Sequence, residues 1–407
     1  MEHIMRIQMP RVTVSGNQVV LRTEIMRDGK PFCCQFHYPV EYCQYICNER
    51  SDAFLISILP YAMQHSFHIQ CEAPVSERLL YQIRNYYIPV LAKAQKNFHS
   101  ITIEAQADNQ ILNIGKAVGT GLSCGVDSFY SVLKHINHPQ TDYRLTHLVS
   151  MNVGSFGAQG GEFSQKWFRE ELTKARKVAH QMQLPLIEIN SNLMEFYQQN
   201  HASSGTFRMA GAILGLQKLF SVYYISSGFS LNGFDITSED NDDYDLFNLM
   251  VASNESTHFY SSGIEATRFE RTRFVSDFEV TYNNLTVCLS GDKNCGKCEK
   301  CLRTIGALYV LGRLERYRNV FDIGYFYRHR HYMLVKMRCY GIGYMKEMYK
   351  EIFQALKQRN TMYYCLITLQ AYIFQFPYEK TIVGAKKFLK KVLPDRYLVA
   401  LKKRVKR

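Results

Sequence analysis

The sequence lacks any long, uninterrupted apolar run. Its richest stretch, residues 210–229, contains Gln217, Lys218 and several glycines and serines, whereas a membrane-spanning helix needs about 20 mostly apolar residues. The first ten residues include Glu2, His3 and Arg6, which are foreign to the apolar core of a secretory signal. We therefore expect a cytoplasmic protein without a membrane span.

Internal repeats, low-complexity tracts and glycine- or proline-rich linkers are also missing. Hydrophobic residues make up 46% and charged residues 21% of the 407 residues, close to ordinary globular usage, so wholesale disorder is excluded. At roughly 150 residues per domain, the length allows two or three domains.

Cysteines are frequent, but most lack metal-binding spacing. Twelve are present without a signal for export, which predicts a reducing compartment in which thiols serve as core residues, metal ligands or catalysts. Cys33, Cys34, Cys43, Cys47 and Cys71 have no C-x₂-C pairing and are interpreted as core thiols.

Acidic residues are nearly absent from the C-terminal end. Between Lys386 and Arg407, ten Lys or Arg face only Asp395, a balance of 10 − 1 = +9 within a total of +13. Pro394 divides this segment into two short amphipathic pieces. Such a tail predicts binding to an anionic membrane surface or to nucleic acid. The alternative is a solvated helical end packed by its apolar face.

The coarse pattern predicts three regions. Residues 1–110 form an N-terminal α+β domain, with strands at the alternating stretches and one helix that begins at Ser76 as N-cap. The expected strands cover residues 11–14, 18–23, 32–37, 66–71 and 100–104.

Residues 111–304 alternate apolar strands with helices, which is typical of a doubly wound parallel sheet. The first expected strand ends at Leu122, and three more cover residues 145–153, 186–189 and 222–226. One expected helix follows Asp127, and two others cover residues 163–182 and 207–220. Residues 305–407 form a helical, basic C-terminal region, with periodic stretches at 344–356 and 362–376.

The first of the expected central strands runs into a loop of small residues, Ser123-Cys124-Gly125-Val126-Asp127-Ser128. Small residues let backbone amides turn inward around an anion, and the following helix adds its free N–H groups. Asp127 brings a carboxylate that could hold phosphate-bound Mg²⁺. A plain strand-to-helix turn is the alternative. Neither a Walker A loop nor a dinucleotide fingerprint is completed.

This loop resembles the S-G-G-x-D-S loop of the PP-loop, or N-type ATP pyrophosphatase, family, and five of six positions agree. The exception is Cys124, which stands in place of the first glycine. The resemblance implies a Rossmann-like sheet of the adenine nucleotide alpha hydrolase (HUP) type. It also implies cleavage of ATP between the α and β phosphates after a substrate oxygen is adenylated, with Ser123, Asp127 and Ser128 in catalytic positions.

A second segment at the end of a strand, Ser227-Gly228-Phe229-Ser230 with Asp235, matches by position the family's G-x-N-x-x-D stretch, although the Asn is missing. Gly228 and Asp235 are therefore candidate nucleotide-binding residues, against the alternative of an ordinary loop. The acidic stretch at 239–245 has no EF-hand glycine and is interpreted as a solvated loop. Arg268, Arg271 and Arg273 are either partners of the triphosphate or surface residues.

Four cysteines have metal-ligand spacing. Cys288, Cys295, Cys298 and Cys301 form C-x₆-C-x₂-C-x₂-C, which predicts a closed tetrahedral Zn²⁺ site of structural type. An iron–sulfur cluster is the rival, because four cysteines also suit [4Fe–4S].

The loop and the cysteines in this order resemble the 7-cyano-7-deazaguanine synthase branch of the PP-loop family, whose first cysteine spacing is two residues longer. The likeness covers residues 111–304 and is closer to uncharacterised relatives of that branch. It implies ATP, Mg²⁺ and Zn²⁺ as cofactors, an acid or carbonyl substrate, and an amide or nitrile product. The alternative function is a nucleotide-binding regulatory or defence module without turnover. Association of the chain with copies of itself into a homo-oligomer is a further possibility.

Overall fold

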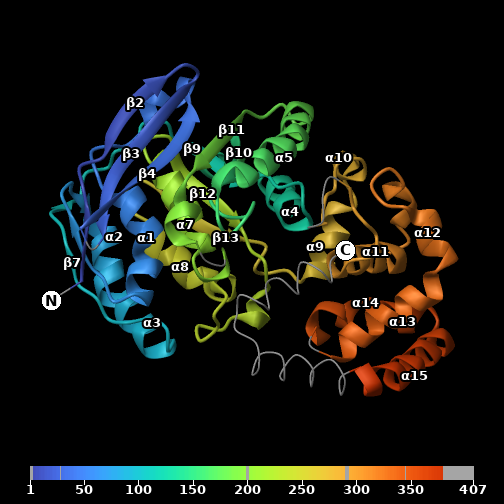
Figure 1. Ribbon diagram of the computed structural model, residues 1–407. Coiled ribbons are helices and arrows are strands. Elements are labelled where there is room, and N and C mark those ends of the chain that lie inside the picture. The colour runs from blue at the N-terminus through green and yellow to red at the C-terminus, as the bar shows by residue number, and fades with distance from the viewer. Residues whose placement is uncertain (1–2, 28, 199–200, 289–292, 344, 379–407) are drawn as a thin grey trace. The chain divides into compact units, whose positions relative to one another are not determined.

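The computed structural model describes residues 3–27, 29–198, 201–288, 293–343 and 345–378 (Figure 1). The chain divides into two compact units, Met1–Val287 and Cys288–Arg407. The basic tail between Lys386 and Arg407, on which the membrane and nucleic-acid expectation rests, lies outside the described residues.

Five parallel strands form the centre of the first unit. Helical crossovers connect them, and the right-handed rule for such crossovers places α4 and α5 on one face and α7 and α8 on the other. The α/β class predicted from the sequence is thereby confirmed. In spatial order the strands are β11 (Leu186–Ser191), β10 (His147–Asn152), β9 (Ala117–Gly121), β12 (Phe220–Ser226) and β13 (His258–Ser262). The helices are α4 (Val126–His135), α5 (Gly161–Gln181), α6 (Leu193–Tyr197), α7 (Gly205–Leu214) and α8 (Asp245–Ala252).

The N-terminal strands continue this sheet. Strand β4 (Lys30–Pro39) pairs antiparallel with β11, so that His37 lies opposite Asn190, and one sheet of 11 strands results. The expected boundary near residue 110 is therefore no break between compact units, because backbone hydrogen bonds join the two regions where β11 would otherwise be an exposed edge. The other strands are β1 (Ile4–Ile7), β2 (Arg11–Ser15), β3 (Gln18–Arg27), β5 (His68–Cys71), β7 (Ile103–Glu104) and the small pair β6 (Val75–Ser76) and β8 (Ala107–Asp108).

The expectation of a single N-terminal helix was wrong, because α1 (Asp52–Gln64) also forms there. Nearly all of its side chains are buried, so it lacks the one-sided apolar pattern that marks a surface helix. It packs closely on α7, where a Cβ on Gly211 would come 2.6 Å from the carbonyl oxygen of Ala53. The predicted N-cap is confirmed: the Ser76 hydroxyl accepts the Leu79 amide at 3.0 Å. That cap starts α2 (Glu77–Gln82), which continues through a π-helical turn (Ile83–Tyr87) into α3 (Ile88–Ala94).

The second unit is helical, as predicted. Helix α11 follows Cys298 directly and packs against α13 and α14, so the cysteines belong with the C-terminal helices and not with the parallel sheet of the first unit. No described helix of either unit combines the length and apolar character needed to cross a membrane. The helices are α11 (Glu299–Val310), α12 (Ile323–Arg328), α13 (Arg330–Ile342), α14 (Lys346–Arg359) and α15 (Thr361–Tyr378).

Candidate functional site

The predicted phosphate loop lies where the sheet reverses its winding order. Strand β9 continues through residues 122–125 into α4, whereas its neighbour β12 continues through 227–230 toward α8. The crossovers around these two strands leave to opposite faces, and the carboxyl ends of strands at such a point are the general ligand position in open α/β sheets. The fold therefore places Ser123–Ser128 and Gly228 at the same end of adjacent strands.

Within the loop, the side chain of Ser128 holds the backbone turn. The Ser128 hydroxyl accepts the amide of Ser123 at 3.3 Å and donates to the carbonyl of Gly125 at 3.2 Å. Gly125 is the N-cap of the ten-residue helix α4, and no side chain caps its first amides. The positive end of the helix dipole therefore lies at the loop, as an anion site requires.

Cys124 adopts a backbone conformation that glycine favours. Its φ is +56°, in the left-handed region that costs an ordinary L-residue roughly 1–2 kcal/mol. Its carbonyl accepts the amide of Thr286 at 2.8 Å, and its side chain is 2% exposed. Burial raises the pKa of the thiol to about 12, so Cys124 is a neutral packing residue and not a nucleophile at neutral pH.

Asp127 is bound by two arginines from α9 (Arg268–Val275). One carboxylate oxygen lies 2.6 Å from Nη1 of Arg271 and the other 2.6 Å from Nη1 of Arg268. Arg271, 1% exposed, also donates to the carbonyl of Ser227 at 2.6 Å. It therefore connects the loop after β9 with the segment after β12.

Helix α9 has the sequence features that hold these arginines in place. It begins with a capping box, in which the Thr267 hydroxyl accepts the amide of Glu270 while the Glu270 carboxylate accepts the amide of Thr267. Arg268 and Arg271 are three positions apart and so share one face. Of the three arginines considered from the sequence, these two meet the loop, whereas Arg273 is exposed.

The charge balance at the loop favours an anion. Two guanidinium groups face one carboxylate, and the N-terminus of α4 adds a partial positive charge. The Nε atom of Arg268 is buried without a hydrogen-bond partner among the described residues. Because both oxygens of Asp127 are engaged by arginines, a Mg²⁺ ion would compete with two guanidinium groups for this carboxylate.

The other two candidate nucleotide-binding residues, Gly228 and Asp235, lie in different surroundings. Gly228 follows β12 directly, and a Cβ there would come 3.4 Å from Oδ2 of Asp242. Asp235 lies on an exposed turn, where its Oδ1 accepts the amide and hydroxyl of Thr237 at 2.9 and 2.7 Å, which lowers the pKa of the carboxyl. No hydrogen bond or ion pair of the described residues joins Asp235 to Asp127.

The acidic stretch is less solvated than expected. Asp245, the first residue of α8, is buried and accepts a hydrogen bond from the Thr206 hydroxyl at 2.5 Å. Burial raises the pKa of Asp245 well above its usual value. Among the described residues, a set of ligand atoms close enough for a metal is found only at the four cysteines.

Those four cysteines converge in the second unit. The sulfur atoms of Cys288, Cys295, Cys298 and Cys301 all lie within 4.8 Å of one another, and two of the pairs are 3.9 Å apart. Tetrahedral Zn²⁺ with Zn–S bonds near 2.3 Å places its sulfurs about 3.8 Å apart. The cluster could therefore hold a metal ion such as zinc.

The local backbone supports this arrangement. The amides of Lys297 and Cys298 point at the sulfur of Cys295, at 3.5 and 3.3 Å. Gly296, between Cys295 and Lys297, has φ +68°. Cys298 is the N-cap of α11, so Cys301 lies in the first turn, where the helix dipole favours a thiolate.

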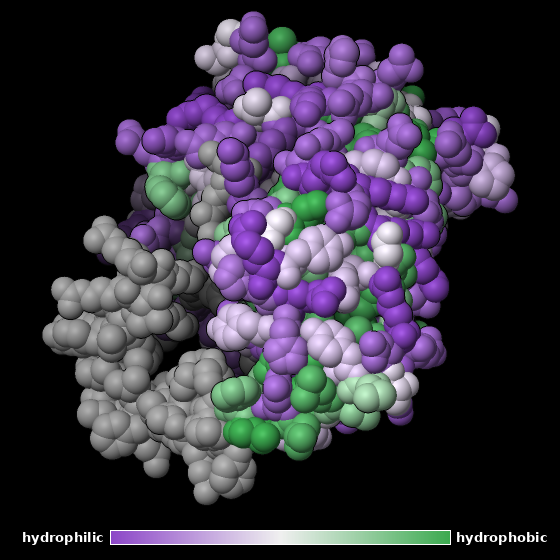
Figure 2. All heavy atoms as spheres, turned by 90° about the vertical axis from the view of Figure 1, so that its right-hand side faces the viewer, coloured by the Kyte–Doolittle hydropathy of each residue, from purple (hydrophilic) through white to green (hydrophobic). Residues whose placement is uncertain are grey.

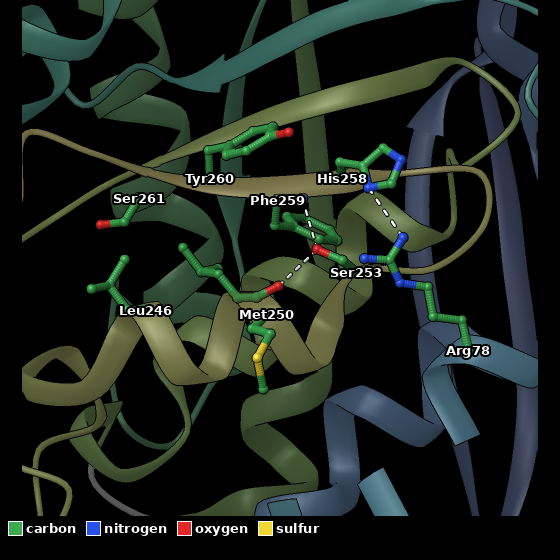
Figure 3. Close-up of a pocket in the computed structure, with 9 residues that line it drawn as sticks. Arg78, Leu246, Met250, Ser253, His258, Phe259, Tyr260 and Ser261 are labelled. Carbon is green, nitrogen blue, oxygen red and sulfur yellow. Dashed lines mark hydrogen bonds between the residues drawn. The ribbon is translucent and has the colours of Figure 1, made fainter. Parts of the chain in front are cut away.

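A separate cavity of about 280 Å³ lies between α8 and β13. Figure 3 shows Arg78 pointing at His258 at its rim, with 3.4 Å between Nη1 and Nδ1. The floor is apolar, and none of the residues predicted for the nucleotide site lines it. The lining consists of Arg78, Leu246, Leu249, Met250, Ser253, His258, Phe259, Tyr260 and Ser261.

No family model, curated protein or solved structure matches this chain.

Proposed function

We propose that this chain is an ATP-binding PP-loop protein of HUP type that adenylates a carboxylate or carbonyl substrate. The observation that carries the proposal is the loop after β9, in which small residues, the N-terminus of α4 and two arginines surround one point at the reversal of the sheet. The left-handed φ of Cys124 supports it, because the family motif has a glycine there.

The proposed reaction is the one that the resemblance to the PP-loop family implies, and this charge distribution supports it. A substrate oxygen attacks the α phosphorus of ATP, the bond to the β-phosphate oxygen breaks, and pyrophosphate leaves with the electron pair. The loop amides, Arg268 and Arg271 would stabilise the negative charge that develops on this leaving group. A nitrogen nucleophile then attacks the adenylated carbon and releases AMP, which yields an amide. A second ATP could adenylate the amide oxygen, and elimination of AMP with loss of the nitrogen protons would then yield a nitrile.

The arginines and Asp127 would exchange partners when Mg-ATP binds. Phosphate oxygens would take over guanidinium donors that now bind Asp127, which frees a carboxylate oxygen for the metal. Mg²⁺ would supply neutralisation of phosphate charge. The ion pairs would thus keep the arginines in position before the nucleotide arrives.

The cysteine cluster would have a structural role. Four thiolates fill a tetrahedral zinc shell and leave no position for a substrate. A mononuclear ion suits the short sulfur distances better than [4Fe–4S], because in that cluster each cysteine binds a different iron and the sulfurs lie further apart.

A nucleotide-binding module without turnover is the second candidate. Cys124 favours it, because its side chain occupies a position where the family has none. In that case ATP binding would change the conformation of the loop without adenylation.

Pyrophosphate exchange separates the two functions. Purified protein with ATP, Mg²⁺, labelled pyrophosphate and a panel of carboxylates is expected to form labelled ATP in the presence of the right acid. Tight ATP binding without exchange for any acid would leave only the binding module. Absence of ATP binding would eliminate both.

A further inference from the structure

Helix α15 exposes an apolar stripe along its length. Four of its members are exposed by 85%, 46%, 61% and 60%: Met362, Leu366, Leu369 and Ile373. Their spacing of four, three and four residues puts them on one face of a helix, and Tyr372 lies beside them. Hydrophobic atoms gather at the lower end of Figure 2, where α15 lies.

No residue of α15 carries a charge. The 18 residues Thr361–Tyr378 contain no Asp, Glu, Lys or Arg, whereas six are aromatic. A solvent-exposed helix normally has charges on its outer face. An apolar stripe of this extent on an exposed helix indicates that another surface covers it.

Cations of α13 and α14 pack on the tyrosines of α15. Arg330 and Arg338 of α13 lie over the rings of Tyr363 and Tyr364, with the guanidinium carbons 6.0 and 5.4 Å from the ring centres. Lys357 of α14 also lies over Tyr364, 5.9 Å from its ring centre. Long cationic side chains beside an apolar strip are typical of a surface that lies in the boundary of an anionic bilayer.

The charge of the whole unit points to the same partner. Residues 288–407 contain 26 Lys or Arg and 8 Asp or Glu, so the balance is 26 − 8 = +18. The total is +13, which leaves 13 − 18 = −5 for residues 1–287. Described residues 293–378 alone contribute 15 − 5 = +10. Two copies of such a unit repel each other, whereas an anionic surface attracts it.

We infer that the stripe of α15 docks on an anionic lipid bilayer, with the helix lying in the plane of the surface. Nucleic acid fits the charge, but it offers phosphates and ring faces and gives no partner to Met362, Leu366, Leu369 and Ile373. An aliphatic stripe on a strongly cationic unit matches acyl chains below the helix and lipid phosphates around it.

Vesicle flotation with the full chain tests this docking. The protein is expected to float with vesicles of equal phosphatidylglycerol and phosphatidylcholine, and not with phosphatidylcholine alone. Leu369→Glu should weaken binding at least about tenfold, the factor that burial of one leucine side chain represents. Gln354→Glu, an exposed change of equal charge on α14 of the same unit, should change binding less than about threefold, because it alters only long-range attraction.

A fluorescent reporter tests the geometry. Trp167 is the single tryptophan, so Tyr372→Trp in a Trp167→Phe background reports on the stripe alone. Its emission should shift to the blue on vesicles and be quenched by lipids brominated on the acyl chain. Equal losses in the two Glu variants, or an unquenched reporter, would overturn the docking of α15. Dimerisation that Leu369→Glu abolishes, or nucleic-acid binding without vesicle binding, would overturn it as well.

Discussion

At the scale of single residues, Cys124 combines a strained backbone with a buried thiol. Alanine at this position removes the thiol and keeps the Cβ at φ +56°, whereas glycine removes both. Ordinarily alanine is the more stable of the two. We expect the order to reverse here, with Cys124→Gly about 1 kcal/mol more stable than Cys124→Ala in urea unfolding.

The matched pair for this comparison is Glu170→Gly and Glu170→Ala, at an exposed position within α5. There alanine should be the more stable by about 1 kcal/mol. The same order at both sites would show that Cys124 is not strained. We also expect Cys124→Gly to keep or improve the affinity for Mg-ATP.

Asp127 and Ser123 test the loop as a nucleotide site. Asp127→Ala removes the proposed metal ligand, and Ser123→Ala removes an exposed hydroxyl at the start of the loop. Both variants should lose Mg-ATP binding in calorimetry and still unfold cooperatively, because Arg271 keeps its bonds to the carbonyls of Ser227 and Ala266. Asp142→Ala, an exposed change in the same unit, serves as the control. Unchanged affinity in both loop variants would refute the assignment.

At the scale of elements, α9 contributes the positive charge of the site. Arg268→Met should weaken ATP binding about tenfold or more, since a hydrogen bond to a charged group contributes about 1.5–3 kcal/mol. Arg273→Met makes the same change on the same helix at an exposed position and should leave the affinity within about twofold. Comparable losses of ATP affinity in the two variants would show that α9 acts only through its total positive charge and not through a direct contact of Arg268 with the nucleotide.

Helix α11 begins at the cysteine cluster, so metal and helix should be lost together. Cys298→Ser is expected to release the ion and lower the stability of the second unit, because structural zinc contributes directly to folding free energy. Metal analysis of the unmodified protein should find one zinc per chain. Cys365→Ser, at an exposed cysteine of α15, should retain it. Iron with acid-labile sulfide would instead identify an iron–sulfur cluster.

At the scale of the whole molecule, charge is divided unequally. The tail between Lys386 and Arg407 supplies +9 of the +18 that residues 288–407 carry. Deletion of this tail is expected to abolish binding to anionic vesicles at moderate salt and to leave ATP affinity unchanged. Retained binding would show that α15 and the cations of α13 and α14 are sufficient for binding to vesicles. If the full-length protein binds neither vesicles nor nucleic acid at low salt, the tail has only a structural role.

Local patterns determined what the sequence could predict. The loop residues Ser123–Ser128 and the four cysteines lie close together along the chain, and their chemistry depends on short-range turns, which small residues and C-x₂-C spacing specify. The parallel strands of the first unit followed from alternation of apolar segments with amphipathic helices. Ser76 as N-cap followed in the same way from a single side chain and the amide three residues on.

Only the tertiary structure decided which distant residues meet. Asp127 and Arg271 are 144 positions apart, and no local signal distinguishes Arg271 from exposed Arg273. Helix α1 was not predicted, because a helix that is buried on all sides has no periodic alternation of apolar and polar residues. The pairing of β4 with β11 joined two regions that composition separates. Sequence periodicity reports which side of an element is buried, whereas the partner that buries it is selected by packing of the whole chain.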